Sequence, residues 1–176
     1  TLSDAILEDY ISNKVENLKF TDHFLKYYGP FFDHEINKPD VSSLIFLKED
    51  GICTLEDIVD SGMVYEKEQL KYVMSCLIKA LYILQKNGIA ARDVKLSNFV
   101  LVENEESNAF SYKIKNFSLG CFIFEGITYI GTENISGCSI MYVAPEVERS
   151  FFNRTNKKII KIVEYDPFMA DVFYLG

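Results

Sequence analysis

The chain has 176 residues, of which 48% are hydrophobic and 25% charged, and its formal net charge at pH 7 is −8. This composition excludes a disordered or fibrous protein, and the acidic excess argues against a protein that binds nucleic acid or an anionic membrane, because phosphate groups select clustered Lys and Arg. No apolar stretch approaches the ~18 residues of a membrane span and the N-terminal residues are acidic, so we expect a cytoplasmic protein.

The first predicted element is a helix over residues 2–18, in which apolar residues recur mostly at steps of three to five. Two β-prone runs follow at 24–32 and 43–47, and the polar residues between them predict a strand pair. The clearest helical pattern runs over 66–87, where apolar residues recur at i, i+3, i+4 and i+7. Gly88 supplies the expected end of this helix.

Two short apolar runs, 99–102 and 112–114, predict a small hairpin with a charged loop between its strands. The stretch 120–137 contains four glycines without clear periodicity, which is typical of a functional or mobile loop. Residues 166–176 are apolar and begin like a buried helix.

The cysteines and histidines give no metal-binding pattern. No C-x-x-C pair occurs, and no histidine lies at a zinc-finger interval. We therefore interpret the cysteines as buried free thiols and do not assign the histidines as metal ligands. These residues are Cys53, Cys76, Cys121, Cys138, His23 and His34.

The residues with the clearest chemical meaning lie at 91–98, between the long predicted helix and the following strand. A loop held at both ends can present the carboxylate of Asp93 to a hydroxyl, the ammonium of Lys95 to a phosphate and the amide oxygen of Asn98 to a divalent cation. Taken alone, D-x-K-x-x-N is a weak signal, and an ordinary polar loop is the alternative.

Three further motifs follow in order: N-F-S at 116–118, A-P-E at 144–146 and D-V at 171–172. With residues 91–98 they resemble the eukaryotic protein kinase family, whose marks are H-R-D-x-K-x-x-N, D-F-G, A-P-E and a D-V-x-S-L-G helix. The lysine of the catalytic loop resembles the serine/threonine type. An unrelated α+β domain with accidental matches is the alternative, and it predicts that the motifs do not converge.

The resemblance implies an α+β fold with two lobes, of which the chain holds a partial small lobe and the first part of a mainly helical large lobe. It places the small-lobe part at about 1–47, a hinge at 48–51 and the large-lobe part at 52–176. No G-x-G-x-x-G loop and no V-A-I-K-like strand precede the first helix, and the chain stops within a motif. We therefore expect a fragment of a longer protein, incomplete at both ends, and a degenerate remnant is the alternative.

The resemblance also implies roles for individual residues. Asp93 would be the catalytic base that orients the substrate hydroxyl, and Lys95 would bind ATP and neutralise the transferring phosphoryl group. Asn98 would bind the cofactor through magnesium, and Asn116 stands at the second metal position. The implied cofactors are ATP and Mg²⁺, and the implied partner is a protein substrate with Ser or Thr, or another partner protein.

Three supporting residues are implied in the same way. Arg92 would be the arginine that can pair with a phosphorylated activation loop. Ser139 would support the catalytic loop through its hydroxyl, and Asp171 would bond the backbone of that loop. The family's helix glutamate would fall near Ile11 or Ser12, so neither Glu8 nor Glu16, each about one turn away, can be assigned.

Several motif residues depart from the family pattern. Asn116 replaces the metal-binding aspartate, Ser118 replaces a glycine, Cys138 replaces a glycine and Ala91 replaces a histidine. Replacing a carboxylate by an amide removes a full charge beside Mg²⁺; at an effective dielectric near 20, a unit pair about 4 Å apart is worth ~4 kcal/mol. Two functions therefore remain open: a protein kinase with impaired activity, and a pseudokinase that acts as a binding or allosteric scaffold.

Overall fold

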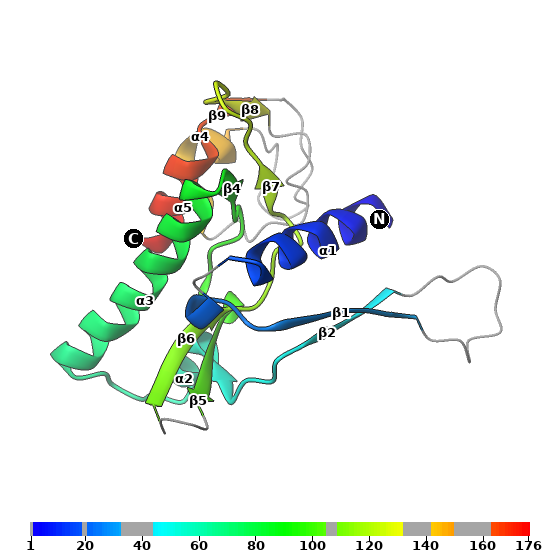
Figure 1. The fold of residues 1–176 in the computed structure, drawn as a ribbon. Helices are drawn as coiled ribbons and strands as arrows, with labels where there is room; N and C mark the ends of the chain where they lie inside the picture. The colour runs from blue at the N-terminus through cyan, green and yellow to red at the C-terminus, as the bar shows by residue number, and fades with distance from the viewer. Residues whose placement is uncertain (1, 19–20, 33–43, 105–108, 132–141, 150–162) are drawn as a thin grey trace.

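The computed structural model describes residues 2–18, 21–32, 44–104, 109–131, 142–149 and 163–176. Helix α1 (Leu2–Glu16) comes first, and strands β1 (Tyr27–Phe32) and β2 (Leu44–Lys48) form an antiparallel pair beside it (Figure 1). The predicted helix and strand pair are thus confirmed. β1 starts three residues later than predicted, because Phe24 forms an isolated bridge with Ile114 instead.

The apolar stripe expected along α1 is buried only near its C-terminal end. Ile11 and Val15 are buried, whereas Ile6 is 58% exposed. Polar contacts hold the helix as well, since the Tyr27 hydroxyl donates to the Asp9 carboxylate and the Tyr27 backbone N donates to Glu16 Oε2 at 2.8 Å.

A short helix that the sequence pattern did not predict follows residues 48–51. It is α2 (Leu55–Asp60), preceded by β3 (Cys53–Thr54). Thr54 caps α2: its side chain accepts from the backbone N of Asp57, and the Asp57 carboxylate accepts from the backbone N of Thr54. Such a reciprocal pair satisfies two donors that a helix start otherwise leaves open.

The long predicted helix is confirmed as α3 (Lys67–Lys86). Gly88 follows it with φ +68°, a conformation that side chains other than glycine rarely adopt. The buried face differs from the expected one, because Cys76 and Ala80 are buried while Leu70 and Ile78 are half exposed. The buried face of α3 therefore combines these two small residues with larger ones, namely Val73, Leu77, Leu81 and Leu84.

The predicted hairpin is also confirmed, with longer strands than expected. β5 (Phe99–Asn104) pairs with β6 (Ala109–Ile114) from Phe99↔Ile114 to Asn104↔Ala109, and β3 extends this sheet on the far side of β5. The glycine-containing stretch is not loop throughout, because it contains strand β7 (Cys121–Phe122). β7 pairs with β4 (Ile89–Ala90), which directly precedes segment 91–98.

The last described elements form a second packed unit (Figure 1). They are β8 (Ile130–Gly131), α4 (Pro145–Glu148), β9 (Glu164–Tyr165) and α5 (Pro167–Leu175). β8 pairs with β9, and Asp166 caps α5 by accepting from the backbone N of Phe168 and Met169. The helix predicted near the C-terminus is therefore confirmed.

Within the part of the chain that the structure describes, two hydrophobic clusters make up the core. The larger one joins α1, α3 and the β5–β6 hairpin and includes Ile11, Phe24, Leu84 and Phe117. The smaller one joins α4, β9 and α5 around Val147 and Tyr165. Segment 91–98 runs between elements of both clusters, so its backbone is held on two sides.

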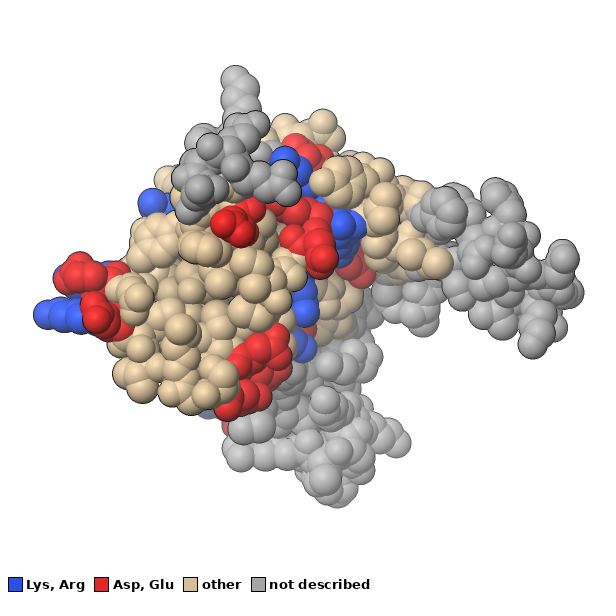
Figure 2. All heavy atoms as spheres, turned by 90° about the horizontal axis from the view of Figure 1, so that it is seen from below, with Lys and Arg blue, Asp and Glu red and all other residues tan. Residues whose placement is uncertain are grey.

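The surface agrees with the acidic composition. On the face shown in Figure 2, Lys and Arg side chains are few and stand next to Asp and Glu, around a broad uncharged area. No cluster of Lys and Arg stands out among the described residues on this face. Among the described residues, no helix is long and apolar enough to cross a membrane.

Candidate active site

Segment 91–98 alternates buried anchors with polar side chains. Ile89, Ala90 and Ala91 are buried where the segment begins, Val94 is buried in its middle, and Phe99 is buried where β5 starts. Hydrophobic burial at these points fixes the backbone. The polar side chains between the anchors are therefore held in defined positions.

Two of the polar side chains contact the carboxylate of Asp93. Lys95 Nζ lies 2.8 Å from Asp93 Oδ2, and Asn98 Nδ2 donates to the same oxygen at 2.8 Å. Asn98 Nδ2 also donates to the backbone O of Asp93 at 2.8 Å. We call Asp93, Lys95 and Asn98 the carboxylate array; these donors hold the Asp93 side chain in one orientation.

The N-F-S motif lies next to this array. The backbone N of Lys115 donates to the backbone O of Asn98 at 3.1 Å. Asn116 is the residue that follows Lys115, so the motif begins directly after this contact with the array. Asn116 Oδ1 accepts from the backbone N of Ser118 at 2.9 Å, which closes a local turn. The structure thus brings together Asp93, Lys95, Asn98 and the Asn116 segment, as expected if the motifs converge.

These oxygens fit a divalent cation only in part. Mg²⁺ prefers anionic oxygen ligands. Asn98 and Asn116 offer neutral amide oxygens, and the carboxylate of Asp93 is paired with Lys95. Among the described residues, no group of three or more His, Cys, Asp and Glu could hold a metal. The donor set therefore fits Mg²⁺ only if a bound nucleotide contributes charged phosphate oxygens.

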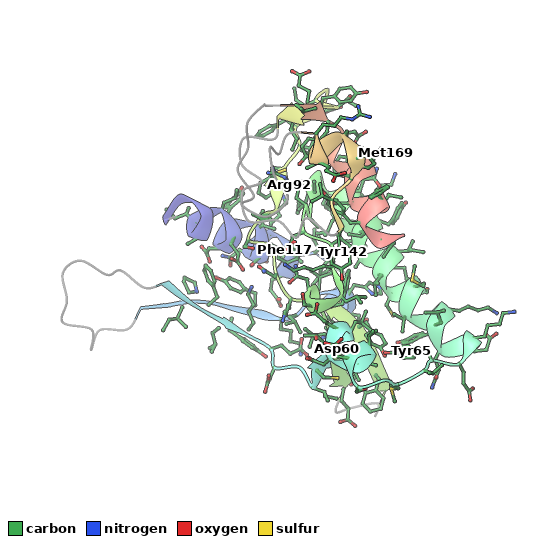
Figure 3. All side chains as sticks on the ribbon, turned by 180° about the vertical axis from the view of Figure 1, so that it is seen from behind. Asp60, Tyr65, Arg92, Phe117, Tyr142 and Met169 are labelled. Atoms are coloured by element: carbon green, nitrogen blue, oxygen red, sulfur yellow. The ribbon has the colours of Figure 1, made fainter. Side chains whose placement is uncertain are left out.

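Phe117 of the N-F-S motif is buried, although position 91 carries Ala91 in place of the family's histidine ring. Its ring centroid lies 6.2 Å from that of Phe24, and both side chains belong to the larger core cluster. Figure 3 shows Phe117 and Arg92 in the central part of the molecule. The Phe24 ring thus packs against Phe117, a contact that the sequence motifs did not predict.

Asp171 in α5 binds the backbone of the candidate loop. Its Oδ2 accepts from the backbone N of Ala91 and its Oδ1 from the backbone N of Arg92, both at 2.7 Å. This confirms the contact expected from the resemblance. Burial raises the pKa of the Asp171 carboxyl to about 7, although the two backbone donors and the nearby Arg92 favour its ionised form.

Arg92 is buried rather than directed toward solvent. It has φ +63°, and its Nε donates to the hydroxyl of Tyr165 at 2.9 Å. Its Nη2 is buried and has no hydrogen-bond partner in the described part of the chain. Burial raises the pKa of Tyr165 to about 12 despite the nearby guanidinium. No sequence pattern indicated Tyr165, and the role expected for Arg92 toward a phosphorylated segment stays a prediction.

The two glutamates of α1 that the sequence could not separate have different partners. Glu8 Oε1 lies 2.9 Å from Lys48 Nζ, and Lys48 Nζ also donates to the backbone O of Lys115 at 3.0 Å. Glu16 instead contacts β1. Glu8 is therefore the glutamate on the side of α1 that faces the Asn116 segment.

Some expectations fall outside the described residues, namely those for Ser139, Cys138 and His34. Of the other cysteines, Cys76 is a buried free thiol as expected, whereas Cys53 and Cys121 are free but only partly buried. Burial lowers the pKa of His23, and Lys79 adds to this effect. The His23 Nδ1 is buried and has no hydrogen-bond partner among the described residues.

Comparison with known proteins adds independent findings. A family model described as "Protein kinase domain" matches residues 18–159. The probable serine/threonine-protein kinase fnkE of Dictyostelium discoideum is 27% identical over 146 residues, which are 78% of this chain and 10% of that protein. Calcium-dependent protein kinase 29 of Arabidopsis thaliana is 37% identical over 90 residues, covering 51% and 16% of the two chains.

A solved structure described as the yeast RNA Pol II CTD kinase CTDK-1 complex contains a similar fold. Its TM-score is 0.68 at 16% sequence identity, and the match covers 98% of this chain and 47% of the other. At this identity the likeness concerns the fold alone. The chain thus spans about half the length of this structural relative and a small part of the curated relatives.

Proposed function

This chain belongs to the eukaryotic protein kinase family and has a partial α+β kinase fold, and from this we propose that it transfers the γ-phosphoryl group of ATP to Ser or Thr of a protein. The observation that carries the proposal is the carboxylate array, in which Lys95 and Asn98 both contact Asp93 Oδ2. We further propose residues 1–47 as the small-lobe part, 48–51 as the hinge and 52–176 as the large-lobe part.

Asp93 is proposed to act on the substrate hydroxyl. Its carboxylate is held by two donors, so it can accept a hydrogen bond from a Ser or Thr hydroxyl without reorganising. The hydroxyl oxygen then forms a bond to the γ-phosphorus, the bond from that phosphorus to the β,γ-bridging oxygen breaks, and ADP leaves. The hydroxyl proton passes to Asp93, the general base.

Lys95 and Asn98 are proposed to stabilise charge near Asp93. The Lys95 ammonium lies close enough to the Asp93 carboxylate to approach the same phosphoryl group, whose oxygens it would partly neutralise. Because Nδ2 of Asn98 faces Asp93, the amide oxygen of Asn98 is the atom suited to a cation. Bound Mg²⁺ would neutralise phosphate charge, and Asn98 and Asn116 are the residues proposed to hold it.

A phosphotransfer assay on the full-length protein tests this proposal. With radiolabelled ATP and a library of Ser- and Thr-containing peptides, we expect label on hydroxyl side chains. Asp93→Asn should lower the incorporation at least ~100-fold, the usual range for loss of a general base. Asp60→Asn, which changes an exposed acid on α2, is the matched control. Equal incorporation by the wild type and Asp93→Asn would refute the role of Asp93.

A second candidate function is a nucleotide-binding scaffold without efficient transfer. It is favoured by Asn116, whose amide carries no charge and whose Oδ1 is engaged by Ser118. Thermal unfolding with ATP, in the presence and absence of Mg²⁺, separates the candidates because a ligand of the native state raises its apparent stability. A shift that requires Mg²⁺ supports the kinase, and an equal shift in EDTA supports the scaffold.

A further inference from the structure

Lys48, the last residue of β2, contacts two segments that lie far from it in the sequence. Its Nζ lies 2.9 Å from Glu8 Oε1 in α1 and 3.0 Å from the backbone O of Lys115, the residue before Asn116. The same Nζ lies 5.6 Å from the centroid of the Phe46 ring. One ammonium group therefore connects the hinge strand, the first helix and the N-F-S segment.

The pair is largely shielded from water. The Lys48 side chain is 20% exposed and the Glu8 side chain 13% exposed. Removing one partner from a pair this buried leaves the other charge poorly solvated, which is far more costly than losing a surface ion pair. In the N-terminal half of α1, Ile6 is 58% exposed, and the Tyr10 ring contacts the Phe122 ring with its centroid 5.3 Å away. The ion pair with Lys48 thus contributes directly to the position of this half of α1.

The contacts continue from Lys48 to the carboxylate array. Lys48 Nζ donates to the backbone O of Lys115, and the backbone N of Lys115 donates to the backbone O of Asn98. Asn98 Nδ2 then donates to Asp93 Oδ2. A continuous series of polar contacts therefore runs from Glu8 in α1 to the carboxylate of Asp93.

The neighbouring hinge residue provides a comparison within the same molecule. Glu49 Oε2 pairs with Lys113 Nζ at 2.9 Å and also accepts from the backbone N of Lys26 at 3.0 Å. Lys113 belongs to β6, and none of its described contacts reaches α1. The hinge thus carries two similarly buried ion pairs, of which one contacts α1 and the other contacts the large-lobe sheet.

We propose that Lys48 is a positioning residue that couples helix α1 to the Asn116 segment and, through Lys115 and Asn98, to Asp93. A displacement of α1 that breaks the Glu8 pair then releases the Lys48 contact with Lys115 and loosens the array. The catalytic consequence rests on the proposed function, whereas the structural coupling does not.

Hydrogen exchange of the full-length protein tests the coupling without any activity. In Lys48→Met, backbone amides of α1 and of residues 115–118 should both exchange at least ~10-fold faster than in the wild type. In Lys113→Met, which removes the other hinge ion pair, exchange in α1 should be unchanged. Wild-type exchange rates in Lys48→Met, or equal acceleration of α1 in both variants, would overturn the proposal.

A charge reversal separates the two contacts of Lys48. The double variant Glu8→Lys with Lys48→Glu restores an ion pair to α1 but places a carboxylate against the Lys115 carbonyl. We expect protection of α1 to recover and that of residues 115–118 to stay low. Recovery in both segments would show that the Lys115 contact is unimportant and would overturn the proposed route to Asp93. If Lys48→Met does not fold, Glu8→Gln takes its place and should accelerate exchange in α1.

Kinetics then tell the coupling apart from the proposed reaction. If the protein transfers phosphate, Lys48→Met should lower kcat about 10-fold or more with little change in the KM for peptide, and Lys48→Arg should recover part of the loss. If the wild type does not transfer phosphate but Lys48→Met still exchanges faster than the wild type, the coupling is retained and only the proposed function is refuted. An unchanged kcat together with faster exchange would refute the link from Lys48 to Asp93.

Discussion

The carboxylate of Asp171 accepts a hydrogen bond from the backbone N of Arg92 at 2.7 Å, across 79 positions of the sequence. Together with the bond from Ala91, this contact attaches the start of the candidate loop to helix α5. The loop residues are therefore held from the side of α5 as well as by the buried anchors within the loop.

Asp171 predicts a distinct pH dependence of stability. Burial raises its folded-state pKa to about 7, above the unfolded value near 3.8. Between these values the folded protein binds more protons than the unfolded chain, so this contribution is present below about pH 4 and is lost as the pH rises through 7. The limiting slope for one proton is about 1.4 kcal/mol per pH unit.

Asp171→Asn removes this titration, and urea unfolding of both proteins from pH 5 to 8 measures it. The free energy of unfolding of the wild type should fall more steeply with pH than that of the variant. Since all other ionisable groups are shared, parallel curves would contradict the assignment to Asp171.

Tyr165→Phe should destabilise the protein by about 1–3 kcal/mol, because it leaves Arg92 Nε buried without an acceptor beside an Nη2 that already lacks one. Tyr129→Phe alters a tyrosine that is 61% exposed and is the control. Denaturant titration measures both free energies. Equal stability of the two variants would show that the Arg92 contact contributes nothing.

Gly51→Ala should also destabilise the protein, because a Cβ at position 51 would lie 1.9 Å from Val100 Cγ1. Overpacking of this kind typically costs about 1–3 kcal/mol. Combining it with Val100→Ala should recover part of the loss, so the two free-energy changes should not add. Additive effects in a double-mutant cycle would indicate that the two residues are not in contact.

Asn116→Asp should strengthen magnesium-dependent binding of ATP at least ~10-fold, because it adds a full negative charge at the proposed metal position. Titration of a fluorescent ATP analogue at fixed protein, with and without Mg²⁺, measures the change. Asn17→Asp adds the same charge in an exposed position and should leave the affinity unchanged. If both variants bind alike, Asn116 does not lie at a metal position.

Elements with a long, regular apolar spacing could be predicted from the sequence. Helix α3 and the β5–β6 hairpin are examples, and their bounds differ from the prediction by a few residues. Helix α2 was missed because it has six residues, too few for a periodic pattern. The spacing of Thr54 and Asp57, which is that of a capping box, was the signal that could have revealed it.

The residues of the candidate site could be predicted from the sequence, but the distant residues that hold them in place could not. Asp93, Lys95 and Asn98 are close in the sequence, so their spacing already suggested a common site, and their contacts agree with it. The partners Lys48 and Tyr165 lie 40 or more positions from the residues they contact. Such contacts depend on tertiary packing, which no local pattern encodes.

The most direct test of the central claim is the single-turnover rate of phosphoryl transfer by the full-length protein at saturating ATP and peptide. This rate reports the chemical step rather than substrate binding. We predict that Asp93→Asn slows it at least ~100-fold while Asp60→Asn leaves it unchanged. Equal rates for the wild type and Asp93→Asn would contradict the assignment of the carboxylate array as the catalytic centre.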